Sequence, residues 1–281
     1  MHELEVRQLS KTYGTGPSAV EAIGDLTFTV DPGEFVCIVG PSGCGKTTLL
    51  KCLSGLLRPT AGSAHLGGQP IVGTPDALAL VFQDYSRSLL PWMTVKGNVT
   101  LPLLAKRMRK AERNKLALDA LGAVGLSGFE NAHPWQLSGG MQQRVAIARA
   151  LAYQPRLLLM DEPFASVDAQ TRADLEDLVL QVHAQFGITV VFVTHDIDES
   201  IYLADRIIVL TQRPTSVKEM VTVTLPRPRD QMGTKSVPEF ATLRAHVFQL
   251  IKGERTALVD EERAVAEQFD AQEAVVRSAA E

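Results

Sequence analysis

The 281-residue sequence has few cysteines and few aromatic residues, and it lacks any long hydrophobic run. Its three cysteines, Cys37, Cys44 and Cys52, form no C-x-x-C pair. We therefore expect neither a disulfide framework nor a cysteine metal site, and the cysteine usage fits a reducing compartment. No apolar run approaches the roughly 18 residues that a membrane-spanning helix needs. The opening stretch MHELEVRQLSKTYG also lacks the apolar region of a signal peptide. These absences predict an intracellular protein whose link to a membrane depends on a partner.

The sequence also has no large excess of acidic or basic side chains. The 28 basic and 32 acidic side chains leave a net charge of −4, with a pI near 5.9. Because nucleic-acid-binding domains are usually basic, nucleic acid is not expected as a partner. The basic run KRMRKAERNK contains Met108 and Glu112, which favours a solvated amphipathic helix over a contact with nucleic acid or lipid. The length allows one large domain with an appendage.

What the sequence does contain is a series of short strand patterns. ELEVRQL and LTFTV alternate apolar and polar residues, which predicts two half-buried strands, the second ending at a Pro32–Gly33 turn. FVCIVG is continuously apolar, as in a strand buried in a parallel sheet. The similar runs ALALVF, LLLM, ITVVFVT and RIIVL follow it. Helical patterns separate most of these runs, so we expect an α/β fold with a parallel, helix-covered sheet.

Two regions interrupt this alternation. Strand patterns stop between Gln83 and Leu151, where LPWMTVKGNV and LLAKRMRKAERNKLALDALGAV predict a helical insertion over about residues 84–151. From Pro226 onward, LPRPRD predicts a linker, PEFATLRAHVFQLIK predicts an amphipathic helix, and the remainder predicts a mobile helical tail. We therefore expect one domain over residues 1–225 and a C-terminal extension over residues 226–281.

The stretch GPSGCGKTT matches the phosphate-binding motif G-x-x-x-x-G-K-[ST] and lies between a predicted strand and a predicted helix. Its backbone N–H groups would surround phosphate oxygens, Lys46 would reach the β and γ phosphates, and the Thr47 hydroxyl would ligate Mg²⁺. Because Cys44 precedes a helix N-terminus, we also expect thiolate character and inhibition by alkylation. The predicted nucleotide-binding residues of the loop are Gly40, Pro41, Ser42, Gly43, Cys44, Gly45, Lys46, Thr47 and Thr48.

A second part of the predicted site follows the strand LLLM. Asp161 and Glu162 end this strand at the carboxyl edge of the sheet, where α/β folds bind ligands. Buried carboxylates are costly unless they are paired or bound to metal. Asp161 therefore suits the Mg²⁺ shell and Glu162 suits polarising the attacking water, whereas the alternative is a helix-capping pair. Together with the phosphate loop, the two carboxylates favour nucleotide hydrolysis.

A second glycine-rich helix start, LSGGMQQR over residues 137–144, lies far from the phosphate loop. With this motif the chain resembles the ATP-binding cassette (ABC) ATPases of transporters, over residues 3–225. The resemblance implies a P-loop NTPase fold with a mixed, largely parallel sheet core, an N-terminal antiparallel β-subdomain and an inserted α-helical subdomain. It also implies ATP and Mg²⁺ as cofactors.

Four more residues match landmarks of that family. The resemblance implies that Tyr13 stacks on adenine, and that Gln83 binds Mg²⁺ and couples hydrolysis to a partner. Asp168 ends FASVD, the loop that in this family crosses the dimer interface to the nucleotide, although residues 165–167 depart from its usual sequence. His195 closes VVFVTH and matches the switch histidine. Without the resemblance, Tyr13 would be a surface side chain and His195 a structural one.

The resemblance also explains why one chain has two phosphate-binding helix starts. In that family two cassettes pair head to tail, and the signature helix of one covers the γ-phosphate held by the other. Ser138, Gly139 and Gly140 would then bind the ATP of a second copy or of a related cassette, through Ser138 Oγ and the Gly140 N–H. Gln143 and Arg144 come later in the helix and are expected to be scaffold.

The sequence around the motifs is similar to that of the nitrate, sulfonate and taurine importer ATPases. Examples are FQD…LLPWMTV…NV and LTQRPTSVKEMVTVTLPRPRD. This similarity implies a peripheral protein on the cytoplasmic face of the inner membrane, with a permease and a periplasmic solute-binding protein as partners. Exposed apolar residues after Gln83 would either contact the permease or pack within the insertion, namely Leu89, Leu90, Trp92 and Met93. Importers of pyrimidine or thiamine precursors, and a soluble non-transport ABC ATPase, are the alternatives.

Overall fold

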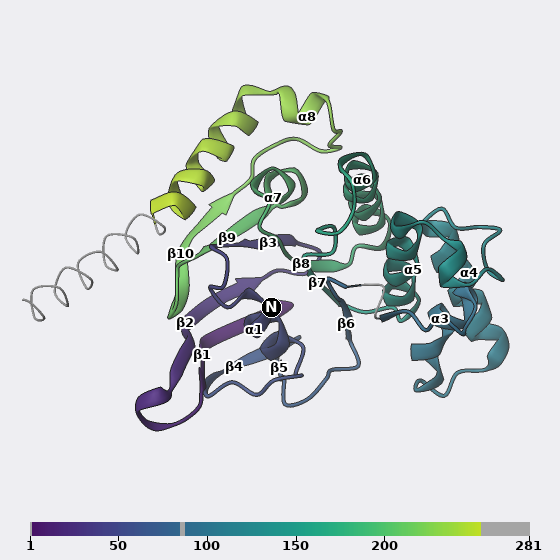
Figure 1. Ribbon diagram of the computed structural model, residues 1–281, viewed down its shortest axis with the longest axis horizontal. Helices are drawn as coiled ribbons and strands as arrows, with labels where there is room; N and C mark the ends of the chain where they lie inside the picture. The colour runs from purple at the N-terminus through teal and green to yellow at the C-terminus, as the bar shows by residue number, and fades with distance from the viewer. Residues whose placement is uncertain (1, 85–87, 254–281) are drawn as a thin grey trace, which may run out of the picture.

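The computed structural model describes residues 2–84 and 88–253 of the chain. Within them, ten strands form one sheet in the order β5-β4-β1-β2-β10-β9-β3-β8-β7-β6 (Figure 1). The strands are β1 (Leu4–Tyr13), β2 (Val20–Val30), β3 (Phe35–Val39), β4 (Ala61–Leu66), β5 (Gln69–Pro70), β6 (Leu78–Val81), β7 (Leu157–Asp161), β8 (Thr189–Val193), β9 (Arg206–Leu210) and β10 (Thr215–Thr222). The α-helices are α1 (Lys46–Leu53), α3 (Val95–Thr100), α4 (Lys110–Ala123), α5 (Gly139–Ala152), α6 (Ala169–Phe186), α7 (Ile197–Leu203), α8 (Gly233–Ser236) and a helix over residues 238–253.

The strands β9, β3, β8, β7 and β6 are parallel. Every residue of β3, β7 and β8 is buried, which confirms that FVCIVG, LLLM and ITVVFVT are buried parallel strands. In the register of the sheet, Ile38 of β3 pairs with Val193 of β8, and Val193 pairs with Asp161 of β7. The three strands therefore end at the same edge of the sheet, with β8 between the other two.

The other part of the sheet is mostly antiparallel. β1 pairs in this way with both β2 and β4, and β4 pairs with β5. The sequence patterns identified β1 and β2 but not β4, β5 or β10, because these three are short or alternate little between buried and exposed positions. β10 is antiparallel to β9 and parallel to β2, so it joins the two parts of the sheet.

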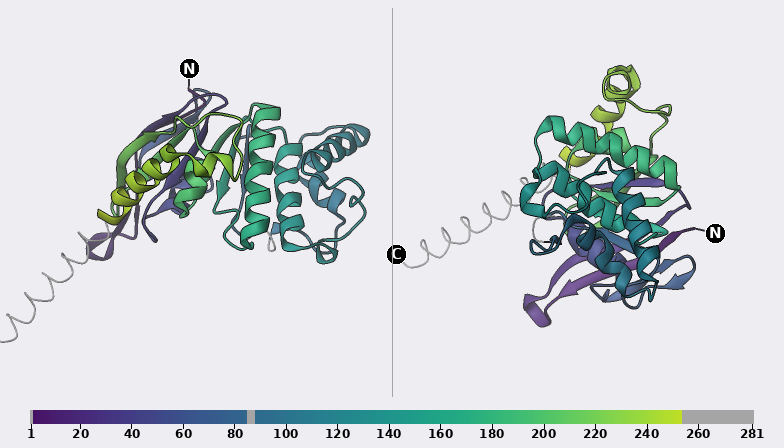
Figure 2. Two further views of the ribbon diagram at one scale, coloured as in Figure 1. Left: turned by 90° about the horizontal axis from the view of Figure 1, so that it is seen from above. Right: turned by 90° about the vertical axis from the view of Figure 1, so that its right-hand side faces the viewer.

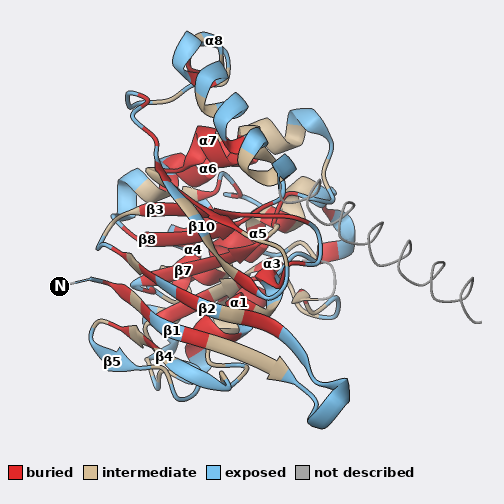
Figure 3. Ribbon diagram, turned by 90° about the vertical axis from the view of Figure 1, so that its left-hand side faces the viewer, coloured by how far each residue is buried: buried red, intermediate tan, exposed pale blue. Residues whose placement is uncertain are grey.

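Apolar side chains pack in two clusters on opposite faces of the parallel strands. Successive residues of β3 alternate between them: Phe35, Cys37 and Val39 belong to the cluster that includes α5, α6 and α7, whereas Val36 and Ile38 pack with α1. Figure 3 shows these buried strands running through the middle of the molecule. Because both faces are covered, the parallel strands are apolar throughout rather than alternating.

The helices α3, α4 and α5 gather at one end of the molecule (Figures 1 and 2), which confirms the helical pattern expected between β6 and β7. α4 begins only at Lys110, because Arg107 has a φ of +52°, a left-handed conformation that interrupts a helix. The expected amphipathic pattern holds for Met108, but the expectation of solvated basic residues is wrong for Lys106. Lys106 Nζ donates to Tyr153 O and lies over the Tyr153 ring, and Met108 packs against the core.

The segment before α3 is a turn held from inside by Asn98, which is fully buried. Asn98 Oδ1 accepts a hydrogen bond from the Leu90 N–H (2.7 Å), and Nδ2 donates to Leu90 O (3.1 Å) and Met93 O (3.3 Å). The turn leaves Trp92 73% exposed but Leu89 only 3% exposed. The expectation of an exposed side chain is therefore wrong for Leu89 and right for Trp92.

After β10 the chain passes over α6 and α7 and reaches the helix over residues 238–253 (Figure 2). Phe240 and Val247 of this helix are buried, which confirms the amphipathic helix expected for PEFATLRAHVFQLIK. An ion pair of 2.5 Å joins Arg244 to Asp198 of α7. The expected tail over residues 253–281 lies outside the described residues except for Gly253, which still belongs to this helix. None of the helices in the described ranges is both long enough and apolar enough to cross a bilayer.

Candidate active site

The phosphate-binding motif forms the turn between β3 and α1. Gly43 and Gly45 have φ values of +77° and +116°, which side chains rarely adopt. A Cβ on Gly45 would also lie only 3.0 Å from Ala22 O in β2 and 3.2 Å from Thr215 Oγ1 in β10. Both the backbone conformation and this close approach require glycine at position 45, as the motif predicts.

A cavity of about 380 Å³ opens beside this loop. Its lining residues are Ser42, Gly43, Gly45, Lys46, Thr47, Thr48, Glu162, His195 and Arg213. Gly40 and Pro41 are buried in the loop behind it. The Tyr13 hydroxyl lies 3.3 Å from Thr48 Oγ1 and its side chain is half-exposed, so an exposed ring stands next to the loop. The structure thus brings together most of the residues predicted around a bound nucleotide.

The Lys46 side chain is folded back onto its own loop. Its ammonium donates hydrogen bonds to Gly40 O (2.9 Å) and Pro41 O (3.1 Å), and the residue is buried. The two carbonyls therefore hold a positive charge at the base of the cavity. A charge fixed in a site that is partly shielded from water attracts an anion more strongly than one on an open surface.

Cys44 does not meet the expectation of a reactive thiolate. Its side chain is fully buried, and Sγ would lie 3.1 Å from a Cβ on Gly40. Burial raises the pKa of the Cys44 thiol, and the nearby Lys46 charge lowers it by less. The thiol points into the apolar cluster beneath the loop, so only the backbone of Cys44 is available to a ligand, and the expectation of easy alkylation is wrong.

Asp161 ends β7 and is 8% exposed. Burial raises the pKa of the Asp161 carboxyl, the adjacent Glu162 charge raises it further, and a hydrogen bond with the Thr47 side chain lowers it. The hydrogen bond brings a hydroxyl from the first turn of α1 and a carboxylate from β7 together. Oxygen donors of these two kinds are typical ligands of a hard divalent cation.

Glu162 follows Asp161 in a strained conformation, with a φ of +43°. Its N–H donates to Val193 O (2.9 Å) at the end of β8, which fixes the backbone there. Glu162 Oε2 lies 2.9 Å from His195 Nδ1, and both residues line the cavity. The order of the strands explains this pairing: β8, which leads to His195, lies between β3 and β7. A carboxylate and an imidazole therefore face the space beside the phosphate loop.

Gln83 is not brought into this arrangement. It follows β6 at the edge of the sheet, is exposed and does not line the cavity. Nor do the described residues contain a cluster of three or more His, Cys, Asp or Glu side chains that could hold a metal ion. A cation here would therefore depend on Thr47, Asp161 and the phosphates of a nucleotide, which is the usual mode for Mg²⁺.

The second glycine-rich helix start also lies outside this cavity. Ser138 is the N-cap of α5, and its Oγ accepts a hydrogen bond from the Met141 N–H (3.3 Å). Ser138 and Gly139 are exposed, and neither they nor Gly140 line the cavity. Later in the helix, Arg144 donates to Val124 O (2.9 Å), as expected of scaffold. This helix start therefore faces outward.

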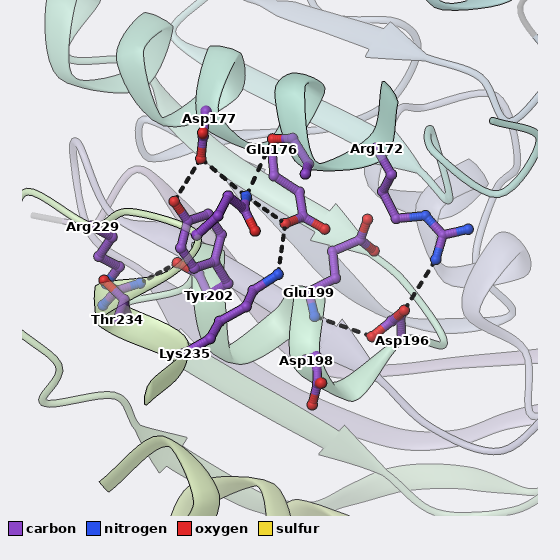
Figure 4. A network of polar contacts seen from close by, with 12 residues as sticks. Arg172, Glu176, Asp177, Asp196, Asp198, Glu199, Tyr202, Arg229, Thr234 and Lys235 are labelled. Carbon is purple, nitrogen blue, oxygen red and sulfur yellow. Dashed lines mark hydrogen bonds and ion pairs between the residues drawn. The ribbon is translucent and has the colours of Figure 1, made fainter. Parts of the chain in front are cut away.

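Asp168 is exposed as well and is the N-cap of α6. Its carboxylate accepts hydrogen bonds from the Thr171 N–H (3.0 Å) and the Thr171 hydroxyl (2.7 Å), and these lower the pKa of the Asp168 carboxyl. Arg172, which follows Thr171 in α6, forms an ion pair with Asp196 (3.3 Å) (Figure 4). Asp196 is the N-cap of α7 and directly follows His195. The first turn of α6 thus contacts the segment that carries His195.

Two residues of the site were not predicted from the sequence. Arg213 lines the cavity, and Thr215 is fully buried beneath the loop, where its hydroxyl donates to Ala22 O (3.0 Å) and to Cys44 O. Both belong to the turn and strand after β9, the part of the sheet that the patterns missed. Only the polar sequence TQRPTS marks this region, and it matches no phosphate-binding motif.

Comparison with known proteins identifies the family. The family model "ABC transporter" matches residues 23–165. An uncharacterized ABC transporter ATP-binding protein of Methanocaldococcus jannaschii is 46% identical, over 90% of this chain and 92% of that protein. A bicarbonate transport ATP-binding protein of Synechocystis is 40% identical, over 88% of each chain. A nitrate import ATP-binding protein of Synechococcus elongatus is 39% identical, over 86% of this chain and 89% of that one.

A solved structure agrees with this result. It is a dimeric ATP-binding cassette in a post-hydrolysis state with ADP and Pi, 36% identical, with a TM-score of 0.68 over 78% of this chain and 98% of that one. The sheet topology, the phosphate loop and the LSGG helix start described above are the features that the two chains are expected to share. The chain therefore belongs to the ABC transporter family and is an ATPase.

Proposed function

We propose that this ATPase energises a bacterial importer of small solutes of the nitrate, sulfonate or taurine type, and that it works as a head-to-tail pair of cassettes. The observation that carries the proposal is that the helix start at Ser138, Gly139 and Gly140 lies outside the chain's own cavity. A helix N-terminus with unsatisfied N–H groups attracts anions. In the pair, each such helix start would meet the triphosphate held by the other copy.

The chemistry proposed for the cavity is attack of water on the γ-phosphate. Glu162 accepts a proton from the water and aligns it, and His195 holds Glu162 through their 2.9 Å contact. Lys46 exchanges its loop carbonyls for phosphate oxygens, and Tyr13 stacks on adenine. Mg²⁺, when bound, would neutralise charge on the phosphates; Thr47 and Asp161 would hold it, and Gln83 would approach from β6 on closure.

A groove of about 430 Å³ between β6 and α5 is proposed as the contact with the permease. Ala146, Ala150 and Tyr153 form one wall, and Arg149 lies among them. Arg149 also donates to Ser88 O (2.6 Å), so the groove adjoins the segment after Gln83. A permease helix seated there would bring the protein to the cytoplasmic face of the inner membrane as a peripheral subunit, beside a periplasmic solute-binding protein, with no role for nucleic acid.

The two parts of the chain would have separate tasks. We assign ATP chemistry to residues 1–225, with the helical subdomain at about residues 84–151 acting as the part that moves toward the second cassette. Residues 226–281 would form an extension. In its described portion, Gln231 donates to Glu176 Oε2 and Asp177 Oδ1 (both 3.0 Å), so the extension is anchored on α6.

The solute itself would be chosen by the binding protein and the permease. The relatives named for nitrate import and for bicarbonate transport support a small anion. Pyrimidine or thiamine precursors are the alternatives. The test is the ATPase activity of the reconstituted transporter with each candidate loaded binding protein: the cognate solute should stimulate turnover, and stimulation by none of the anions would favour the alternatives.

The ATPase chemistry is tested by Glu162→Gln. Since the amide cannot accept the proton, turnover should fall by at least about 100-fold while MgATP binding is unchanged. The variant should also accumulate as an ATP-bound dimer, measured by light scattering after gel filtration. Glu112→Gln on α4, an exposed residue outside the cavity, is the matched control. Unchanged turnover in Glu162→Gln would remove the assignment.

His195→Ala tests the second cavity residue. Loss of the imidazole frees Glu162 to adopt other rotamers, so turnover should fall by about 10-fold or more with nucleotide affinity retained. Steady-state kinetics and fluorescent-nucleotide binding measure the two effects separately. If affinity falls as much as turnover, His195 contributes to binding rather than to orientation of the carboxylate.

A further inference from the structure

The start of the signature helix packs against the start of α6 without any space between them. An ideal Cβ on Gly140 would lie 2.4 Å from Thr171 Cγ2, a distance that real Cβ atoms essentially never show. The next nearest atoms, Thr171 Cβ and Oγ1, would lie at 3.8 and 3.9 Å. Gly140 itself is in ordinary helical conformation within α5. Within the chain, therefore, a side chain at position 140 would force the methyl group of Thr171 to move.

The hydroxyl of the same threonine has a different partner. Thr171 Oγ1 donates to Asp168 Oδ2 (2.7 Å), and the Thr171 N–H donates to Asp168 Oδ1 (3.0 Å). Asp168 ends the loop that leads from Glu162 to α6. Thr171 thus touches the signature helix with its methyl group and the loop after Glu162 with its hydroxyl group.

The adjacent residue extends this link to the second cavity residue. Arg172 forms an ion pair with Asp196, which follows His195 directly (Figure 4). Gly140 and Thr171 are half-buried and in direct contact, so a displacement of one is passed to the other. A shift of Gly140 toward a ligand would therefore move the first turn of α6, and with it the segments that carry Glu162 and His195.

We propose that Thr171 is a positioning residue that links the signature helix to the catalytic pair of its own chain, and that its methyl group is the reason why residue 140 must be glycine. The inference rests on the proposed head-to-tail function, in which Gly140 meets the second copy's triphosphate. Closure on that triphosphate displaces Gly140, and the contact already present passes the displacement to the methyl group. The contact then fixes Asp168, and through it the orientation of Glu162. Each copy senses occupancy of its partner's site in this way.

The competing explanation is that glycine is required only because the phosphate approaches closely. The two explanations differ in what Gly140→Ala does once Thr171 is made smaller. Serine at 171 keeps the hydroxyl that holds Asp168 but lacks Cγ2, so the nearest atom to the new Cβ would be 3.8 Å away. Thr171→Ser should therefore rescue Gly140→Ala if the methyl group is the obstacle. It cannot do so if the phosphate is.

The experiment compares Gly140→Ala, Thr171→Ser and the double variant, each in the full chain. ATP-dependent dimers are measured in the Glu162→Gln background and turnover in the Glu162 background. Gly140→Ala should lower both by about 10-fold or more, since misplacement by 1 Å at a reacting group costs up to 100-fold. The double variant should recover at least about half of each loss, and its thermal midpoint should return to that of the parent.

Thr171→Val separates the contact that the methyl group makes with Gly140 from the hydrogen bond that the hydroxyl donates to Asp168. Valine keeps a methyl group against Gly140 but removes the hydroxyl, so ATP-dependent dimers should still form. With only the backbone N–H left to hold Asp168, kcat should fall about 10-fold at nearly constant KM, a split that a purely structural defect would not give.

The outcomes separate the inference from the function on which it rests. If Glu162→Gln forms no ATP-dependent dimer, the proposed function fails and the inference fails with it. If that dimer forms but the double variant is as defective as Gly140→Ala, the inference alone is overturned. The same holds if Gly140→Ala behaves as the parent, or if Thr171→Val lowers dimer formation and kcat equally.

Discussion

The two glycine-rich helix starts of this chain use the same backbone chemistry but face different surroundings. At the start of α1, Lys46 is buried and the loop lines a cavity together with residues from β7 and β8. At the start of α5, Ser138 is exposed and its hydroxyl accepts a hydrogen bond from the Met141 N–H of its own helix. The first helix start has a site built around it, whereas the second presents its donors outward.

This difference teaches that a phosphate-binding sequence does not by itself make a complete site. The loop before α1 is anchored from below, because the Thr215 hydroxyl donates to Cys44 O and Gly45 packs closely against Ala22 O, and this fixes its N–H groups before any ligand arrives. The start of α5 is held by the buried Leu137 before it and by the contact of Gly140 with Thr171, whereas its N-cap Ser138 stays exposed. Preorganised donors bind without a reorganisation cost. We therefore expect the first helix start to determine nucleotide affinity and the second to determine turnover.

The largest expected effect is loss and recovery of turnover when two defective chains are mixed. Lys46→Ala should bind ATP about 100-fold more weakly, and Ser138→Ala should bind normally but turn over about 100-fold more slowly. A mixed head-to-tail pair contains one Lys46→Ala chain and one Ser138→Ala chain. One of its two sites combines the intact loop of the Ser138→Ala chain with the intact helix start of the Lys46→Ala chain. A 1:1 mixture should therefore recover up to about a quarter of wild-type turnover if copies pair at random.

The control places both changes in one chain. When Lys46→Ala/Ser138→Ala is mixed with wild type, each mixed pair has one defective element at both sites, so turnover should drop below the wild-type contribution alone. Ser138→Gly lacks the hydroxyl donor but costs a helix N-cap only a few tenths of a kcal/mol, so it separates loss of the donor from the roughly 1 kcal/mol that loss of the cap costs in Ser138→Ala. If the mixture of Lys46→Ala and Ser138→Ala is no more active than the average of the two variants, the two helix starts do not combine across copies, and the comparison fails.

Much of the fold could be predicted because its signals are local. FVCIVG and LLLM are buried on both faces, and an apolar run is a direct record of such burial. β10 could not be predicted, because only two of its eight residues are buried and its place between β2 and β9 is a tertiary contact. The start of α4 was also missed, since nothing in the sequence marks Arg107 for a left-handed conformation.

The site divides in the same way. Lys46, Asp161 and Glu162 each stand at a fixed offset from a buried strand, so their convergence follows from strand order and motif spacing. Cys44 was misjudged because the motif shows a helix N-terminus but not the apolar cluster below it. Arg213 was missed because the turn that carries it reaches the cavity only through the pairing of β10.

A smaller effect is expected from Arg213, the unpredicted cation of the cavity. Because a partly exposed guanidinium contributes about 1 kcal/mol to binding an anion, Arg213→Ala should weaken ATP binding about 5-fold and change saturated turnover little. Arg213→Lys should retain part of the affinity. Mixing Arg213→Ala with Lys46→Ala sharpens the comparison. The mixture should not regain ATP affinity, since Arg213 acts on the nucleotide of its own chain. Restoration would place Arg213 with the outward-facing helix start instead.

The smallest effect should come from a region that belongs to neither helix start. Glu199 of α7 is 4% exposed, and burial raises its pKa to about 8, with Glu176 and Asp196 adding to the shift and Thr194 and Arg172 opposing it (Figure 4). The folded protein therefore holds a proton that the unfolded chain releases above its ordinary pKa of 4.5. The stabilising contribution is complete below that value and is lost as the pH rises toward 8.

Glu199→Gln removes this titration while keeping the size of the side chain. The melting temperature of the wild type should fall between pH 6 and 8.5, and that of the variant should fall less, at about 3 °C for each kcal/mol of difference. ATP affinity at pH 7 should be the same in both, because Glu199 does not line the cavity. If ATP affinity or turnover of Glu199→Gln instead changed together with its stability, the carboxylates around Glu199 in Figure 4 would be part of the ATP site. The contrast between the two helix starts would then extend to a third region.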